Sequence, residues 1–352
     1  MKCSQCAYAN PEAVKFCLNC GEKFFKTGKQ EDDTSYFYEF AHYVDMVPKF
    51  ERSVEPKFQN IFSRVFRKHS ELEAERLFIV GTALTTPQLS EVKDTWPKPW
   101  LFARVFMITL LAFAGLYMGV SVFQNANFIP GLIIVGAFAV PIATLIFFWE
   151  MNAPQNIAIY RVMYFVLIGG ILSLLASLVF YDFLRGHINP FTIGIAEEMA
   201  KAITVLIFVR KKKYRYILNG LLIGAAVGAG FAAFETAGYA FRALLTDQGA
   251  AFYNTILWRG IFSPGGHIAW AALTGAAICR VKEDKPLTLR MLFRFKFLRV
   301  FLLVVIMHAL WDTSIPGIMP FGYIFLMAAS WVVVFLMLRA GLKQVGERKL
   351  QI

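Results

Sequence analysis

The sequence predicts an all-α membrane protein, an eight-transmembrane-helix bundle with a small N-terminal zinc-ribbon module. Three observations lead to this fold class. Of the 352 residues, 57% are hydrophobic and only 17% are charged, which is typical of membrane proteins rather than of soluble domains. From residue 101 onward, apolar stretches of bilayer-crossing length follow one another. Two closely spaced pairs of cysteines stand at the N-terminus.

Residues 1–26 are expected to form the zinc ribbon. Two CxxC pairs supply the four thiolates of a tetrahedral structural Zn²⁺ site: Cys3, Cys6, Cys17 and Cys20. Disulfides or a redox CxxC are weaker alternatives, because neither needs two pairs this close. The layout resembles the small zinc ribbons at the ends of many prokaryotic proteins. The metal would supply the folding energy of such a module, the ribbon could bind a protein partner, and reduced thiolates predict a cytosolic location.

Residues 27–98 are expected to be a cytosolic linker that contains an amphipathic helix. From Lys57 to Val80, apolar residues recur at helical spacing and basic residues share the stretch. Such a helix packs against the cytosolic face of the protein or lies on the membrane surface, and packing is the commoner role. Pro87, Pro97 and Pro99 then mark an irregular connection to the first span.

The predicted membrane domain covers residues 99–341, and residues 342–352 are a cytosolic tail. Its eight spans run approximately over 101–123, 129–149, 160–180, 191–209, 217–241, 261–279, 298–315 and 320–339. Lysine and arginine gather in alternate loops and in the tail, which places both termini in the cytosol. The net charge of +12 therefore reflects membrane topology, and a nucleic-acid partner is the weaker explanation. We expect a multi-pass protein of a prokaryotic plasma membrane, in contact with the lipid bilayer.

The fourth span carries three ionisable residues in its middle: Glu197, Glu198 and Lys201. An ionisable residue at that depth costs about 3 kcal/mol or more, so it indicates function. At about 100° per residue, Lys201 lies about 40° from Glu197, and Glu198 lies about 100° from it. The lysine therefore shares a polar stripe with both acids. The alternative is a structural salt bridge, in which the lysine and the glutamates only neutralise one another and have no catalytic role.

The next three spans carry further polar residues, whereas the first three spans carry no comparable group. These residues are Glu235 and Tyr239 in the fifth span, His267 in the sixth, and His308 and Asp312 in the seventh. Glu235 and Tyr239 lie on a glycine-rich face, and His308 and Asp312 are four residues apart on one face. A packing histidine and a helix-end salt bridge are the alternatives. Polar residues in one half of a bundle predict a single interior site.

The motifs EEMAK, FETAGY, His267 and HALWD resemble the four motifs EExxK, FExxxY, His and HxxxD of PrsW-type intramembrane proteases. That family looks related to the CAAX-processing and ABI-type membrane proteases. The resemblance covers roughly residues 100–340. It implies a peptidase that cleaves membrane protein or peptide substrates within or near the membrane. The family has been described both as metalloprotease and as glutamic protease.

Peptide hydrolysis needs an activated water and a group that stabilises the oxyanion. No HExxH motif occurs, so a carboxylate base is favoured and no catalytic cofactor is expected. We assign Glu197 as the base that activates water, tuned by Glu198 and Lys201. Glu235 would share the water or a proton, and His267 would orient the water. By resemblance to the CAAX-type relatives, His308, held by Asp312, donates to the oxyanion; those relatives carry His at the position of Tyr239 and Asn at that of Asp312.

Two other classes of protein fit parts of the pattern. Glutamate, histidine and lysine inside a bundle also form the proton relays of coupled transporters, although transporters usually show broken helices and repeated halves. A catalytically inactive membrane receptor or adaptor would use the zinc ribbon to bind its partner. Proton flux in vesicles would indicate the first, and an unchanged phenotype of Glu197→Ala the second.

Overall fold

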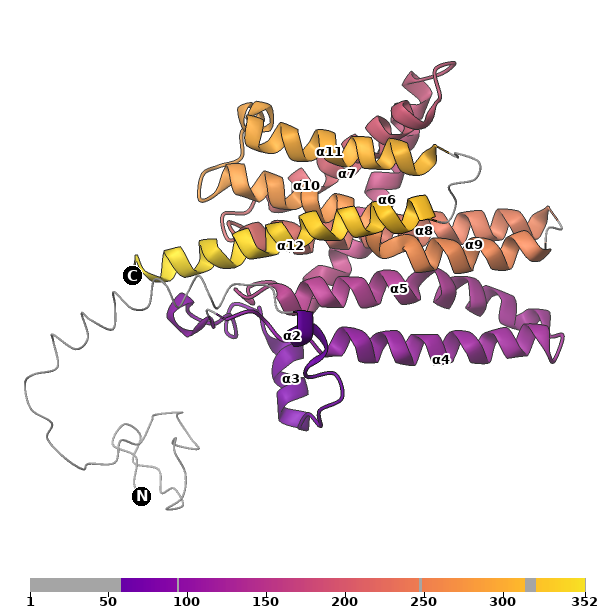
Figure 1. Ribbon diagram of the computed structural model, residues 1–352, viewed down its shortest axis with the longest axis horizontal. Helices are drawn as coiled ribbons and strands as arrows, with labels where there is room; N and C mark the ends of the chain where they lie inside the picture. Colours follow the sequence, from indigo (N-terminus) through magenta and orange to yellow (C-terminus); the bar gives the residue numbers. More distant parts are fainter. Residues whose placement is uncertain (1–57, 94, 247–248, 314–320, 352) are drawn as a thin grey trace, which may run out of the picture. The chain divides into compact units, whose positions relative to one another are not determined.

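The computed structural model describes residues 58–93, 95–246, 249–313 and 321–351, and within these ranges it contains helices and no strand (Figure 1). The chain divides into two units, Met1–Lys49 and Phe50–Ile352, and the description below concerns the second. The predicted zinc ribbon at 1–26, its four cysteines and its structural zinc lie outside the described residues, as do residues 27–57 of the 27–98 segment.

The stretch that precedes the first span is helical in two short pieces rather than in one. Helix α2 is Phe58–Phe62 and helix α3 is Glu71–Ile79, so the single helix predicted from Lys57 to Val80 is wrong. The break is explained by a cap at Ser70, whose hydroxyl accepts the backbone N–H of Glu73 and starts a new helix. The 3₁₀ turn η1, Leu89–Glu91, follows before the chain reaches α4.

Among the residues that the structure describes, five helices are long and apolar enough to cross a membrane. They are α4 (Leu101–Ser121), α5 (Ile129–Met151, preceded by the 3₁₀ turn η2, Ala126–Phe128), α6 (Ile159–Phe183), α8 (Ile217–Leu245) and α12 (Phe321–Lys349). Their bounds agree with the predicted spans to within a few residues, except at the ends of α8 and α12. Helix α12 continues to Lys349, so most of the segment expected as a tail extends the last helix.

The other three predicted spans are less simple. Helix α7 (Pro190–Val209) contains the three ionisable residues, and α11 (Phe295–Asp312) follows the 3₁₀ turn η4 (Leu289–Phe293) and is 18 residues long. The sixth predicted span, 261–279, starts in the last two residues of α9 (Gly249–Phe262), includes the 3₁₀ turn η3 (Ser263–Gly265) and continues in α10 (His267–Lys282). Most of α9 precedes this predicted span. Pro264 and the following glycines interrupt the helix, because proline cannot donate and glycine favours a break. The expected continuous sixth span is therefore wrong.

Helix α8 lies at the centre of the bundle and packs against α5, α6, α7, α9, α10 and α12. Its glycines permit a very close approach to α10. A Cβ at Gly220, Gly224 or Gly228 would meet a backbone carbonyl oxygen of α10 at 2.1, 2.0 or 2.3 Å respectively. For Gly228 that oxygen belongs to His267, so the packing of these two helices sets the position of a candidate site residue.

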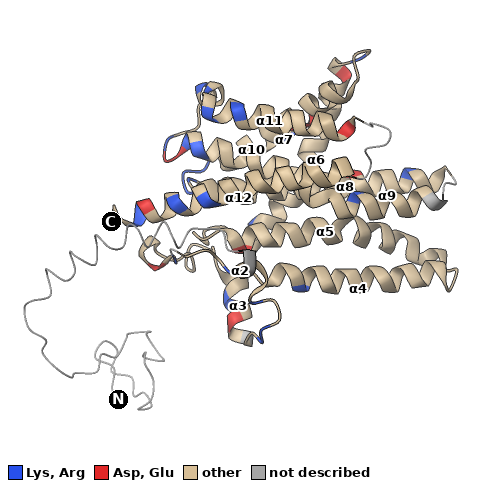
Figure 2. Cartoon of the chain, in the orientation of Figure 1, with Lys and Arg blue, Asp and Glu red and all other residues tan. Residues whose placement is uncertain are grey.

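Basic residues gather at one end of the bundle. Figure 2 shows blue residues at the end where α10 stops, α11 starts and α12 stops. The loops that join α7 to α8 and α10 to α11 lie at this end, as the alternating charges of the sequence predict. The consecutive long helices thus run back and forth between a basic end and an end with few charges.

Candidate active site

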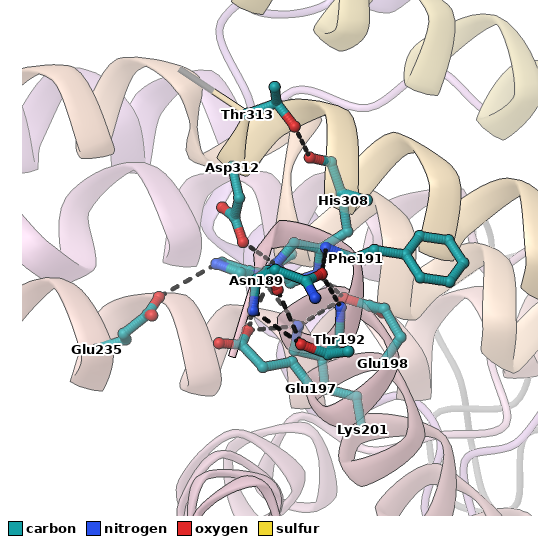
Figure 3. Close-up of polar contacts among 12 residues, drawn as sticks. Asn189, Phe191, Thr192, Glu197, Glu198, Lys201, Glu235, His308, Asp312 and Thr313 are labelled. Atoms are coloured by element: carbon teal, nitrogen blue, oxygen red, sulfur yellow. Dashed lines mark hydrogen bonds and ion pairs between the residues drawn. The ribbon is translucent and has the colours of Figure 1, made fainter. Parts of the chain in front are cut away.

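The site is built on α7, whose start is fixed by local chemistry. The side chain of Asn189 accepts the backbone N–H groups of Phe191 and Thr192 at 3.0 and 3.1 Å, and Pro190 occupies the first helical position. The hydroxyl of Thr192 accepts the N–H of Asn189 in return, which completes a capping box (Figure 3). Two turns further on, the helix presents its ionisable residues to the bundle interior.

Lys201 lies between the two glutamates and is completely buried. Its Nζ is 2.6 Å from Oε1 of Glu198 and 3.4 Å from Oε2 of Glu197, and it lies 4.1 Å from the ring centroid of Phe231. Both acids are buried too, with exposed fractions of 5% for Glu197 and 0% for Glu198. The helical wheel places Lys201 nearer in angle to Glu197, but the flexible lysine side chain makes its shorter contact with Glu198. Such burial is tolerable only because the charges are paired.

His267 is the first residue of α10 and joins α7 to α8. Its Nδ1 lies 2.9 Å from Nζ of Lys201, and its Nε2 lies 3.1 Å from Oε2 of Glu235. An ammonium group can only donate, so Nδ1 accepts and Nε2 carries the proton that it donates to Glu235. The break between α9 and α10 thus brings the His267 side chain between two charged residues of other helices.

His308 of α11 contacts carboxylates through both ring nitrogens (Figure 3). Its Nδ1 lies 2.8 Å from Oε1 of Glu198, and its Nε2 lies 3.4 Å from Oδ2 of Asp312 and 3.7 Å from Oε2 of Glu197. The ring stacks on Trp270 with centroids 4.7 Å apart. The structure therefore contains the expected His308–Asp312 contact, but Glu198 holds this histidine at the shorter distance.

Two residues that the sequence analysis did not assign to the site contact its carboxylates. The hydroxyl of Tyr181, on α6, donates to Oε1 of Glu197. The guanidinium of Arg259, on α9, pairs with Glu235 and also donates from Nε to the hydroxyl of Thr236 at 3.2 Å. Tyr181 is one residue beyond the predicted span 160–180 and looks like an interfacial tyrosine, whereas Arg259 lies between the predicted spans 217–241 and 261–279 and looks like a loop charge. Neither position carries a sequence signal that separates it from those common roles.

Among the residues that the structure describes, Tyr239 is the one predicted catalytic residue that makes no hydrogen bond or ion pair with the glutamates or histidines. The guanidinium carbon of Arg259 lies 4.5 Å from the centroid of the Tyr239 ring, and that of Arg242 lies 4.8 Å from the same centroid. Tyr239 is also 40% exposed. It therefore borders the site through Arg259, which in turn contacts Glu235.

The centre of the cluster has the donor set of a metal site. One ligand atom each from Glu197, His267 and His308 lies within 4.8 Å of the others. Two imidazoles and one carboxylate are a common ligand set of catalytic zinc. In each histidine the second nitrogen contacts a carboxylate, Glu235 for His267 and Glu198 for His308, as is usual for metal-bound histidine. The residues present therefore fit a divalent metal ion.

The fold and the cluster define a class of protein: a polytopic helical membrane protein with a buried site of acids, histidines and a lysine. A family model described as PrsW family intramembrane metalloprotease matches residues 161–339, which is just over half of the chain. The chain belongs to this family, and the resemblance noted from the motifs is confirmed. The match begins at the start of α6 and includes every helix that contributes to the cluster. Comparison with curated proteins and with solved structures gives no match.

Proposed function

We propose that the protein hydrolyses peptide bonds of membrane-associated protein substrates with a water molecule activated by Glu197. Family membership supports a peptidase that acts in the membrane. The observation that carries the mechanism is the convergence of four polar side chains on the carboxylate of Glu197. They are Tyr181 and Lys201, which donate to it, and His267 and His308, whose nearest ring nitrogens lie 3.9 and 3.7 Å from Oε2.

The roles follow from what each side chain can donate or accept. Glu197 takes a proton from water, and the neighbouring ammonium of Lys201 stabilises its ionised form before that transfer. Tyr181 holds the other oxygen of the same carboxylate and so limits its rotation. His267 donates its proton from Nε2 to Glu235, so its Nδ1 is an acceptor. A water molecule could donate to this Nδ1 once the ammonium of Lys201 moves away from it.

His308 is the proposed donor to the oxyanion. Because Glu198 accepts from Nδ1 at 2.8 Å, His308 can donate to an oxyanion from Nε2 only as the doubly protonated imidazolium. The Nε2 side of the ring faces the cluster, near Asp312 and Glu197. Stacking on Trp270 keeps the ring in this orientation. A donor that is already in place costs no reorganisation when negative charge develops on the carbonyl oxygen.

Metal-dependent hydrolysis is the second candidate, and both the ligand set and the charge balance favour it. The cluster contains four carboxylates and two permanently charged cations. The carboxylates are Glu197, Glu198, Glu235 and Asp312, and the cations are Lys201 and Arg259. With all carboxylates ionised and both imidazoles neutral, the net charge of the cluster is −2. Glu197, His267 and His308 would hold the ion. A bound divalent ion would lower the pKa of a ligated water and polarise the substrate carbonyl.

Metal analysis and cleavage, measured on the same sample, separate these candidates. Lys201 contacts the Nδ1 lone pair of His267 that a metal ligand would need, so lysine and metal compete for one atom. Under the glutamate mechanism, purified protein cleaves membrane substrates after exhaustive chelation and contains no stoichiometric metal at the site. Activity that is lost on chelation and restored by one divalent ion per protein, in addition to the zinc expected in the ribbon, would replace the glutamate mechanism by the metal mechanism. No cleavage of any membrane substrate under either condition would contradict the peptidase proposal.

The proposed topology has eight crossings, with α9 and α10 together forming the sixth, and both termini in the cytosol of a prokaryotic cell. The basic end of the bundle supports this orientation, since loops rich in lysine and arginine remain on the cytoplasmic side. The zinc ribbon would then face the cytosol, where it could bind a partner protein. Cysteine labelling from outside intact cells tests the proposal, which requires that Cys3, Cys6, Cys17 and Cys20 stay unlabelled.

A further inference from the structure

A pocket lies away from the candidate active site, at the end of the bundle where α4 begins and α5 ends. It has a volume of about 920 Å³ and is lined by residues of the turn that follows α2, of α3, of the segment before α4, and of the end of α5 and the loop after it. Figure 1 shows α2 and α3 beside the start of α4. None of the predicted catalytic residues lines it. Its volume lies within the range of about 300–1,000 Å³ that is usual for ligand sites.

The acidic residues that line this pocket are already occupied. Glu150 accepts the backbone N–H groups of the first turn of α4, from Trp100, Leu101 and Phe102, at 2.7, 2.9 and 2.9 Å. Glu91 accepts the N–H of Gln88 at 2.9 Å. Glu73 pairs with Arg64 and His69 at 3.6 and 3.1 Å.

The basic residues of the lining are mostly without such partners. Among the described residues, no carboxylate lies within ion-pair distance of four of them: Arg67, Arg76, Lys93 and Lys98. With Arg64 included, five cations oppose three carboxylates around the cavity, which gives the pocket an excess of positive charge. Guanidinium groups in particular match the geometry of phosphate oxygens.

The surroundings of the pocket indicate a position at the membrane interface. Trp100 immediately precedes the first residue of α4, and Arg104 lies over its ring at 4.6 Å. Phe62 and Phe66, next in sequence to the lining residues Ser63 and Arg67, are 60% and 94% exposed. Exposed aromatic residues beside arginines are typical of segments that insert into the boundary between headgroups and acyl chains. A pocket for a soluble anion would not need them.

We propose that this pocket binds the phosphate headgroup of an anionic phospholipid, with Arg67, Arg76, Lys93 and Lys98 around the phosphate and the phenylalanines of α2 and its following turn in the acyl region. Anionic lipid is attracted to basic segments at a membrane surface. The proposal is independent of how, or whether, the candidate active site cleaves peptides.

Native mass spectrometry of the full-length protein in detergent tests this by titration with phosphatidylglycerol and, separately, with phosphatidylcholine. Wild-type protein should retain one phosphatidylglycerol more tightly than phosphatidylcholine. At about fivefold per cation, the pair Arg67→Gln and Arg76→Gln should weaken that binding about 25-fold. The matched control is Arg290→Gln with Lys296→Gln, which removes the same charge from exposed positions outside the pocket. Unchanged melting temperatures of both variants show that the fold persists.

Three outcomes would overturn the proposal. The first is equal retention of the two lipids by wild-type protein. The second is an equal loss in the control pair, which would indicate a general surface-charge effect. The third is displacement of phosphatidylglycerol by millimolar inorganic phosphate or glycerol 3-phosphate, which would identify a soluble phosphate compound as the ligand. Retention of the lipid under that competition, with loss only in the pocket variant, supports the headgroup site.

Discussion

The ammonium group of Lys201 lies 2.9 Å from Nδ1 of His267, and this contact determines which ring nitrogen carries the proton. Because lysine only donates, the proton of a neutral His267 must be on Nε2, which faces Glu235 at 3.1 Å. The two glutamates of α7 are thereby connected to α8 through one lysine and one histidine. Disturbing either end of this connection should affect the chemistry as well as the packing.

Arg259 should act as a positioning residue, because it pairs with Glu235 and so orients the carboxylate that accepts from His267. Arg259→Gln should lower kcat by about 10–100-fold, as expected when an orienting partner of a functional histidine is lost, and should shift the pH profile. Arg259→Lys should restore part of the activity. The control is Arg242→Gln, which also approaches Tyr239 but makes no contact with Glu235 among the described residues. An equal loss in both variants, without a change in the pH profile, would refute this role.

Tyr181→Phe should reduce kcat by about tenfold and leave KM nearly unchanged. The variant removes one hydrogen bond to the carboxylate of Glu197 and leaves the aromatic packing in place. Tyr160→Phe on the same helix is the control, since that hydroxyl contacts Arg161 at 3.1 Å on the exposed surface. Steady-state cleavage assays on the three proteins measure the effect. Full activity of Tyr181→Phe would show that the tyrosine does not restrain the carboxylate.

Gly228→Ala should displace the start of α10 and with it His267. An added Cβ would lie 2.3 Å from the carbonyl oxygen of His267, so one of the two helices must move, at a cost of about 1–3 kcal/mol. Gly238→Ala on the same helix has no neighbouring atom within 4 Å and should leave stability equal or raise it, because alanine favours helix. Melting temperature and cleavage rate are the measurements. Equal behaviour of the two variants would contradict the close packing of α8 on α10.

Asp284 should make stability depend on pH at the basic end of the bundle. The hydrogen bonds from Arg348 hold the pKa of Asp284 below the usual aspartate value of 3.8. A lowered pKa in the folded state means that the pair stabilises the fold above pH 3.8 and ceases to do so as pH falls through the folded-state pKa. The carboxylate is 55% exposed, so the effect is at most about 1 kcal/mol.

Thermal unfolding of wild type and Asp284→Asn between pH 3 and pH 7 measures this contribution. The two melting temperatures should differ at neutral pH and converge at the acid end of the range. A difference that persists or grows at low pH would show that the pair does not titrate as described.

The spans and the residues of the cluster could be predicted because charge within an apolar helix is rare and costly. The wheel placed Lys201 and Glu197 on one stripe, and the structure places both in the interior. It could not predict that Lys201 would reach Glu198 more closely, since the four-carbon side chain has freedom that a wheel ignores.

Other features depend on tertiary contacts that leave no local pattern. The turn at Pro264 has a local signal, but the separate helix α9 and the pairing of its Arg259 with Glu235 do not. Tyr181 resembles any interfacial tyrosine until α7 is packed beside it. The division of the Lys57–Val80 stretch at Ser70 could be predicted in part, because Ser70 followed by Glu73 is a typical helix start.

The most direct test of the central claim is the cleavage rate of Glu197→Gln on a membrane-protein substrate, with Glu347→Gln as a control that makes the same change at an exposed position. The amide keeps the shape of the side chain and removes its basicity. Glu197→Gln, folded as shown by its melting temperature, should cleave at least about 10²–10⁴-fold more slowly than wild type, while the control should be unaffected. Cleavage by Glu197→Gln at the wild-type rate would contradict the assignment of this carboxylate as the base.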